Sequence, residues 1–189
     1  MSEQLAAMTA DIEKLNSKIQ SAVADGRLMQ SAAKNIRTLL AGAPSDLYSR
    51  AVSELVEAGE WPELNDRFYQ TLAFGTGGLR GRTIGKIITK AERGNTAHSA
   101  AATGRPEFPC VGTNAMNFFN ISRATRGLVG YLHERNDREK VSGKPKIVIA
   151  HDPRFFSKEF CELTAKVASE NGCDAFVFDG PRSVPESRC

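Results

Sequence analysis

The chain has 189 residues, of which 41% are hydrophobic and 25% charged, and its net charge is only +3. These proportions are ordinary for a globular protein, and so small a charge argues against nucleic acid as the main partner. No apolar run approaches the roughly 20 residues of a membrane span, and the N-terminus lacks the pattern of a signal peptide. We therefore expect a cytoplasmic protein without a membrane or nucleic-acid partner.

Residues 1–26 show the apolar spacing of a helix. Its stripe consists of Leu5, Met8, Ile12, Leu15 and Ile19, at steps of three and four residues. The pattern is typical of a helix that packs on its own domain, but three heptads also allow a coiled-coil helix that supports self-association.

Three further helices are expected before residue 73. Their apolar positions are Leu28, Ile36, Leu39, Leu40, Leu47, Val52, Leu55, Val56, Leu64, Phe68 and Leu72. Ser45 is the expected N-cap of the middle helix and Gly59 its stop, while Pro62 suits the first turn of the last one.

The next stretch, residues 72–86, reads LAFGTGGLRGRTIGK and matches neither common nucleotide-binding template. A Walker A loop would need lysine where Arg82 stands and glycine where Thr76 stands. The dinucleotide fingerprint would need its third glycine at the position of Arg80.

The residue types in this stretch nevertheless suit an anion. Gly77 and Gly78 allow close approach of the backbone, Thr76 offers a hydroxyl, and Arg80 offers a two-pronged donor that fits a phosphate. On composition alone, an anion site and a plain turn are equally supported.

The segments between the glycines and the C-terminal region carry weaker patterns. Residues 87–113 lack periodicity and predict a long surface loop. Helical spacing returns at Asn114 and continues to Leu132, and residues 133–145 read as a charged, solvated connector. The four cysteines, Cys110, Cys161, Cys173 and Cys189, form no C-x-x-C pair and predict reduced, structural thiols.

Two short apolar runs, KIVIA at 146–150 and AFVF at 175–178, predict buried strands. The helix between them is expected to begin at an N-cap, Ser157, and to end at Gly172. Strand, helix and strand in this length form a parallel βαβ unit. The fold class is therefore α/β.

A polar group, HDPR at residues 151–154, follows the first strand, where open α/β sheets bind ligands. Asp152 could serve phosphate transfer, but Arg154 occupies the place where a haloacid-dehalogenase-like site needs its second carboxylate. Asp152 and Arg154 can also simply pair with each other. His151 suits a structural hydrogen bond better than a catalytic base.

Two stretches resemble a known family. FGTGGLRG, residues 74–81, resembles the N-terminal signature of the phosphoglucomutase/phosphomannomutase superfamily, the α-D-phosphohexomutases. The preceding ELNDRFYQTLA is particularly similar to the branch of phosphoglucomutases and phosphopentomutases. Residues 146–186 resemble the family's strand, Asp-x-Arg loop, helix, strand and Pro-Glu segment in the same order. The resemblance covers roughly residues 45–187.

The resemblance implies a fold and a reaction. Residues 45–189 would form an incomplete three-layer α/β/α domain with a mixed sheet, preceded by a helical extension, residues 1–44. Family members pass a phosphoryl group between a phosphoserine and a sugar phosphate, and so interconvert sugar 1-phosphate and 6-phosphate, or pentose 5-phosphate. They use Mg²⁺ and a sugar bisphosphate activator.

The resemblance also implies site residues. Those beside the phosphate of the phosphoserine would be Thr76, Gly77, Gly78 and Arg80, while Asp152 and Arg154 would brace a loop. The family's serine loop, its Asp-x-Asp-x-Asp metal loop and its sugar-recognition loop match no stretch before Cys189. We therefore expect no catalytic serine and no metal ligand in this chain, and no activity from it alone. The alternatives are a noncatalytic anion-binding or assembly module, or a truncated product without a separate role.

Overall fold

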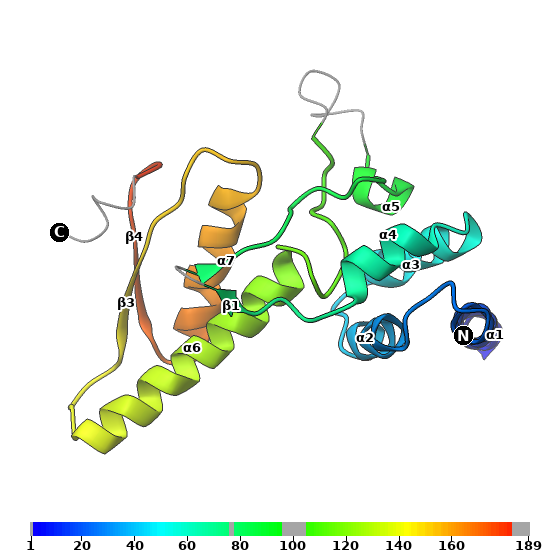
Figure 1. Ribbon diagram of the computed structural model, residues 1–189. Helices are drawn as coiled ribbons and strands as arrows, with labels where there is room; N and C mark the ends of the chain where they lie inside the picture. The colour runs from blue at the N-terminus through cyan, green and yellow to red at the C-terminus, as the bar shows by residue number, and fades with distance from the viewer. Residues whose placement is uncertain (1, 76–77, 96–104, 183–189) are drawn as a thin grey trace. The chain divides into compact units, whose positions relative to one another are not determined.

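The computed structural model describes residues 2–75, 78–95 and 105–182, and it divides into two compact units, Met1–Met116 and Asn117–Cys189 (Figure 1). No helix in these described ranges combines the length and the apolarity needed to cross a membrane. The domain boundary predicted after residue 44 stays a prediction.

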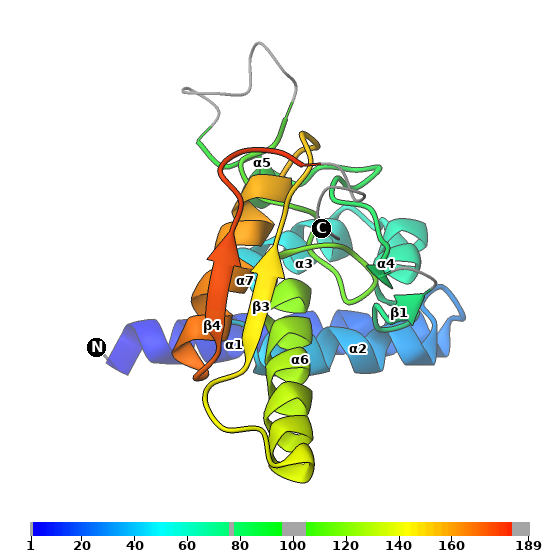
Figure 2. The same ribbon diagram turned by 90° about the vertical axis from the view of Figure 1, so that its left-hand side faces the viewer.

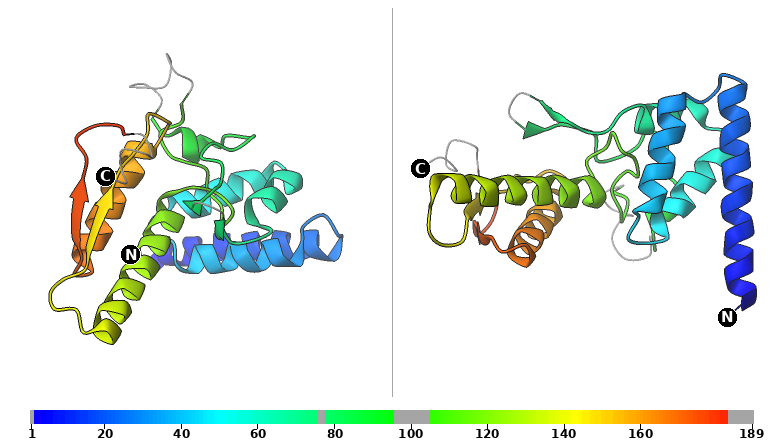
Figure 3. Two further views of the ribbon diagram at one scale, coloured as in Figure 1. Left: turned by 60° about the vertical axis from the view of Figure 1, so that its left-hand side comes forward. Right: turned by 90° about the horizontal axis from the view of Figure 1, so that it is seen from below.

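Four helices pack together in the first unit (Figure 3): α1 Ser2–Ala24, α2 Gln30–Ala41, α3 Leu47–Glu57 and α4 Trp61–Phe68. Helix α1 contacts α2 and α3, and its stripe residues Leu15 and Ile19 are buried. The stripe therefore packs on its own unit, as one of the two interpretations expected. The side chains of Leu5, Met8 and Ile12 lie outside the described part.

The ends of these helices follow the expected signals in part. Pro62 lies in the first turn of α4, and Gly59 follows α3 with a φ of 71°. The prediction of Ser45 as N-cap is wrong, because Asp46 occupies that position and makes no side-chain capping bond. Leu72 is buried as predicted but lies beyond the end of α4.

A small antiparallel hairpin follows α4 and consists of β1 Phe74–Gly75 and β2 Gly78–Leu79. The short helix α5 Lys90–Arg93 comes next in the chain and begins at a capping box formed by Thr89 and Glu92.

The long surface loop predicted over 87–113 is wrong in its described part. Besides α5, the segment holds Cys110 and Val111, each only 1% exposed, and the adjoining Ala115 is fully buried. Local periodicity could not reveal this burial, because the segment is extended and bonds to chain far away in the sequence. Residues 96–104 lie outside the described part.

The second unit begins with α6 Phe118–Glu139, whose N-cap Asn117 accepts a hydrogen bond from the amide of Asn120. The predicted connector over 133–145 is wrong up to Glu139, because the helix continues through these charged residues. They lie on its solvent side, where Arg135 and Glu139 pair one turn apart. The helix ends at Lys140 in a left-handed conformation with a φ of 53°.

The predicted βαβ unit is confirmed, but the prediction of buried strands is wrong, because no residue of either strand is fully buried. Strand β3 Lys146–Ile149 pairs in parallel with β4 Asp174–Val177, and α7 Ser157–Glu170 connects them. Gly172 follows α7 with a φ of 80°. Ser157 is not the N-cap: that position is Phe156, and the Ser157 hydroxyl instead accepts a hydrogen bond from the Asp152 amide at 3.2 Å.

The β3–β4 sheet is covered on one face. Figure 2 shows α6 and α7 behind the two strands. Ile147 and Ala175 pack on that side against buried Val129 and Ala168. Val148 and Phe176, which are partners in the register, are 64% and 53% exposed on the other side. The architecture is consistent with a partial α/β domain that follows a group of helices, so the α/β class is confirmed.

Substitutions on the covered and on the exposed face of β3 are expected to change the free energy of unfolding by different amounts. Ile147→Ala should lower the free energy of unfolding of the second unit by about 1–2 kcal/mol, below the range for fully buried sites, because it removes packing against α6 and α7. Val148→Ala should change it by less than about 0.5 kcal/mol. Urea unfolding followed by the amide NMR signals of β4 measures both, and equal losses would contradict the assignment of the covered face.

Candidate functional site

The glycine-rich segment forms the β1–β2 hairpin. Phe74 pairs with Leu79 and Gly75 with Gly78, and the two residues between the strands, Thr76 and Gly77, lie outside the described part. Of the four residues predicted beside a phosphate, the structure therefore describes two, Gly78 and Arg80.

Arg80 follows β2 directly and is exposed. Among the described residues, none forms an ion pair with its guanidinium. A hairpin followed by an exposed guanidinium, which can donate two parallel hydrogen bonds, suits an anion such as a phosphate.

The base of this hairpin is tied to the segment 110–116. The amide of Leu72, before β1, donates to the carbonyl of Thr113 at 2.7 Å. On the other side, the amide of Met116 donates to the carbonyl of Arg82 at 2.9 Å, and that of Cys110 donates to the carbonyl of Thr83 at 2.8 Å. Both ends of the hairpin are thus bonded to one neighbouring piece of backbone.

A buried ionic cluster lies beneath this base, and the predictions from the sequence missed it. Arg67, fully buried in α4, donates through Nε to Glu63 at 2.7 Å and through Nη1 to Glu92 at 2.6 Å. Glu63 and Glu92 are themselves only 4% and 1% exposed. The one available signal was the spacing of Glu63 and Arg67, one helical turn apart beside the apolar Leu64 and Phe68.

A second arginine joins the cluster from the hairpin side. Arg82 forms ion pairs with Asp66 and, at 3.6 Å, with Glu63. Lys86 also pairs with Asp66 at 3.4 Å, so three cations face three carboxylates. Burial of charged groups requires such pairing.

The thiol of Cys110 lies buried beside this cluster. Burial raises the pKa of Cys110 to about 12, although the nearby Arg67 acts in the opposite direction. Cys161 and Cys173 are also buried and free, which agrees with the expected structural thiols. Cys189 lies outside the described part.

Asp152 and Arg154 meet after β3. The carboxylate of Asp152 accepts from Nε of Arg154 at 2.7 Å and from its backbone amide at 3.0 Å. The Arg154 hydrogen bonds hold the pKa of Asp152 at about 2, and the carboxylate is ionised at neutral pH. His151 bonds through Nδ1 to the Asp152 carbonyl. This pair and the glycine-rich hairpin belong to different units.

The pH dependence of Asp152 follows from this geometry. The folded pKa of Asp152 lies below the unfolded value, so the pair stabilises the fold above the ordinary carboxylate range and loses this contribution as the pH falls towards 2. In Arg154→Ala, the pKa read from the carboxyl ¹³C signal of Asp152 should rise from about 2 towards the ordinary value of about 3.9, while the backbone amide of residue 154 still donates to the carboxylate. The control Lys166→Ala, at an exposed pair with Glu170, should leave the titration at about 2, and an unchanged pKa in Arg154→Ala would contradict the account.

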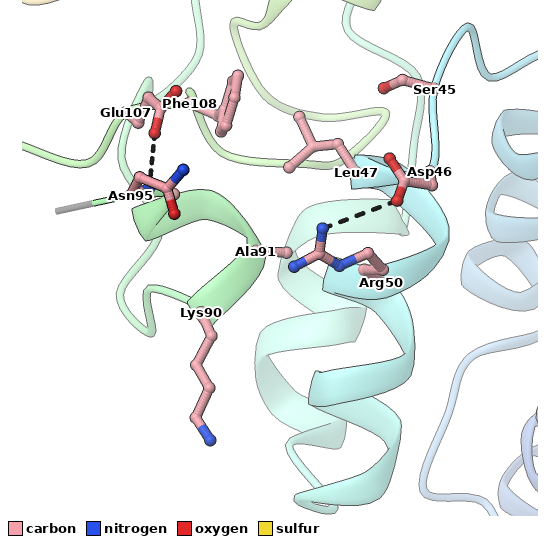
Figure 4. A pocket seen from close by; sticks show the side chains of 10 residues that line it. Ser45, Asp46, Leu47, Arg50, Lys90, Ala91, Asn95, Glu107 and Phe108 are labelled. Carbon is pink, nitrogen blue, oxygen red and sulfur yellow. Dashed lines mark hydrogen bonds and ion pairs between the residues drawn. The ribbon is translucent and has the colours of Figure 1, made fainter.

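A hollow of about 390 Å³ lies elsewhere in the first unit, between the start of α3 and α5 (Figure 4). Its charged side chains are Asp46, Arg50, Lys90 and Glu107, of which Arg50 pairs with Asp46 and Glu107 accepts from the amide of Asn95. It contains none of the predicted site residues, and it presents no concentrated charge of one sign.

The described residues do not fit a magnesium site. Mg²⁺ prefers several oxygen ligands at octahedral geometry. Within residues 2–75, 78–95 and 105–182, no group of three or more His, Cys, Asp or Glu side chains is arranged to hold a metal ion. No chemical step in this chain is therefore assigned to Mg²⁺.

The fold defines the class of this chain as helices followed by a partial α/β domain with a glycine-rich hairpin. Residues 109–189 match the family described as phosphoglucomutase/phosphomannomutase, α/β/α domain I. Together with the relatives below, this match supports assignment of the chain to the phosphohexomutase superfamily, in its phosphoglucomutase and phosphopentomutase branch.

Three curated relatives illustrate the similarity. A phosphoglucomutase of Staphylococcus saprophyticus is 29% identical over 135 residues, which cover 71% of this chain and 19% of the relative. A phosphoribomutase of Saccharomyces cerevisiae is 28% identical over 60% of this chain and 13% of the relative. A probable phosphoribomutase of Schizosaccharomyces pombe is 28% identical over 68% and 17%. The chain thus spans less than a fifth of the length of these relatives, and no solved structure matches it.

Proposed function

We propose that the chain is the N-terminal portion of a phosphohexomutase that interconverts sugar 1-phosphate and 6-phosphate, or pentose 5-phosphate, through a phosphoserine. The observation that carries the proposal is the β1–β2 hairpin, which ends in an exposed Arg80 and lies in the stretch that resembles the family signature. The names of the relatives, phosphoglucomutase and phosphoribomutase, support both sugar classes as substrates.

In this proposal the hairpin binds the phosphate group carried by the serine. Arg80 offers two parallel donors to the phosphate oxygens, and Gly78 keeps the backbone beside them free of a side chain. Thr76 would add a hydroxyl, and Gly77 a second residue whose backbone has no side chain beside it. Donors held in place before the reaction stabilise charge on the moving phosphoryl group, which is the main task in this chemistry.

The pair of Asp152 and Arg154 has a supporting role in the proposal. Asp152 holds the guanidinium of Arg154 through a side-chain hydrogen bond and leaves the rest of the fork exposed at the end of β3. The pair would brace the loop at this edge of the sheet in the complete enzyme. Mg²⁺, the sugar bisphosphate activator and a cytoplasmic location also belong to the proposal.

We expect the 189-residue chain to give no turnover by itself, because the family's serine and metal loops match no part of it. The assay incubates the purified chain with glucose 1-phosphate, a sugar bisphosphate activator and Mg²⁺ and measures glucose 6-phosphate. Formation of product that Arg80→Ala abolishes would overturn the expected inactivity.

A further inference from the structure

The orientation of the glycine-rich hairpin depends on the segment 110–116. The hairpin is bonded to this segment at both ends, through the amide of Leu72 on one side and through the carbonyls of Arg82 and Thr83 on the other. Gly81 lies so close to this segment that an added Cβ would be 3.2 Å from the amide nitrogen of Met116. The contacts that hold residues 110–116 in place therefore also determine the orientation of the hairpin.

Arg67 is connected to that segment by three hydrogen bonds: one from its side chain, one to its backbone carbonyl and one through Glu92. Its Nη1 donates to the carbonyl of Val111 at 3.2 Å, and its own carbonyl accepts from the amide of Asn114 at 2.9 Å. Glu92, which Arg67 binds, accepts in turn from the amide of Val111 at 2.7 Å.

Arg67 also holds the chain that leaves the hairpin. Its Nη2 donates to the carbonyl of Ile87, and Gly85 lies against the same guanidinium. The rigid, planar fork of an arginine can serve these separate directions at once, whereas a lysine ammonium ends in a single nitrogen on a flexible stem.

We infer that Arg67 is a positioning residue for phosphate recognition: from its buried place in α4, it fixes the chain on both sides of the β1–β2 hairpin and thereby sets where Gly78 and Arg80 lie. The inference rests on the proposed function for the identity of the ligand, but the effect on the backbone does not. Arg67 itself is fully buried.

The test compares the 189-residue chain with Arg67→Lys, which keeps the positive charge and loses the fork. Hydrogen exchange of the Leu72 and Met116 amides reports local opening at the base of the hairpin. We expect their protection to fall about tenfold more than that of amides in α2. Arg50→Lys, at an exposed pair with Asp46, is the matched control and should change neither set.

The second measurement titrates inorganic phosphate and follows the amide signals of Gly78 and Arg80. We expect about tenfold weaker binding in Arg67→Lys than in the unchanged chain, because a loosened support misplaces the donors. If Arg67→Lys does not fold, Glu92→Gln, which keeps the shape of the side chain and removes its charge, should show the same two effects.

The outcomes separate the two claims. Protection that falls evenly across the first unit, together with unchanged phosphate affinity, would assign Arg67 a purely structural role and overturn the inference. If the unchanged chain binds no phosphate at Gly78 and Arg80, the proposed function fails, and the hydrogen-exchange result alone decides whether Arg67 positions the hairpin.

Discussion

Replacement of Arg67 by methionine is expected to lower the free energy of unfolding of the first unit by about 3–5 kcal/mol, the usual cost of removing one partner from a buried ion pair. The side chain of Arg67 is fully buried between Glu63 and Glu92, and its loss leaves two buried carboxylates without their main cation. Urea unfolding followed by the fluorescence of Trp61, the single tryptophan of the chain, measures this loss within α4 itself.

The matched control is Arg50→Met. Arg50 pairs with Asp46 at 3.7 Å, but both side chains are more than 60% exposed, and such pairs contribute less than about 1 kcal/mol. In the background of Glu63→Gln and Glu92→Gln, Arg67→Met should cost much less, because the uncompensated charges are gone. Equal losses in Arg67→Met and Arg50→Met would contradict the buried cluster.

Gly112→Ala is expected to destabilise the first unit by about 2–3 kcal/mol, since it forces extra volume into a tightly packed place. A Cβ at Gly112 would lie 2.7 Å from the carbonyl oxygen of Arg67 and 3.0 Å from its Cβ. The carbonyl is part of the backbone of α4 and already accepts from the amide of Asn114, so it cannot move aside cheaply. The same fluorescence measurement applies.

Gly130→Ala provides the opposite case. Gly130 lies within α6, and an added Cβ would meet nothing within 4 Å. Alanine is the better helix former by up to about 1 kcal/mol, so this substitution should stabilise the second unit. If Gly130→Ala destabilises the second unit, or if Gly112→Ala leaves the first unit equally stable, the packing described around these glycines is contradicted.

The elements that could be predicted from the sequence are those whose cause is local. The helix that contains Leu64 and Phe68 follows from apolar spacing and from Pro62. The two strands follow from short β-branched runs with a helix between them, and their parallel pairing follows from the length of that connection. The caps were less predictable, because Ser45 and Ser157 each have a neighbour that takes the capping position.

The buried cluster could not be predicted in the same way, because its contacts connect distant parts of the chain. Arg67 bonds to Glu92 and Val111, which are 25 and 44 residues away. Composition alone places such residues in solvent, since arginine and glutamate are rarely buried unless paired. The same distance explains why the sequence around Val111 predicts a surface loop. The backbone of this segment bonds to Arg67, Leu72, Arg82 and Thr83, and the Val111 amide bonds to Glu92, 19 residues away.

The glycine-rich stretch was the most informative part of the sequence for function and only partly informative for structure. Its residue types suit an anion site and a plain turn equally, and only its resemblance to a family signature favours a phosphate. The structure adds the hairpin that places Arg80 directly after β2.

The most direct test of the account is an NMR titration of the chain with O-phosphoserine, with serine as the control ligand. We predict that the amide signals of Gly78, Leu79 and Arg80 move in a saturable way with a dissociation constant of about 1 mM, a free energy of about 4 kcal/mol. Serine should have no effect, and Arg80→Ala should abolish the response. Signals that do not move, or that move only in residues 117–182, would contradict the assignment of the glycine-rich hairpin as the phosphate-binding element.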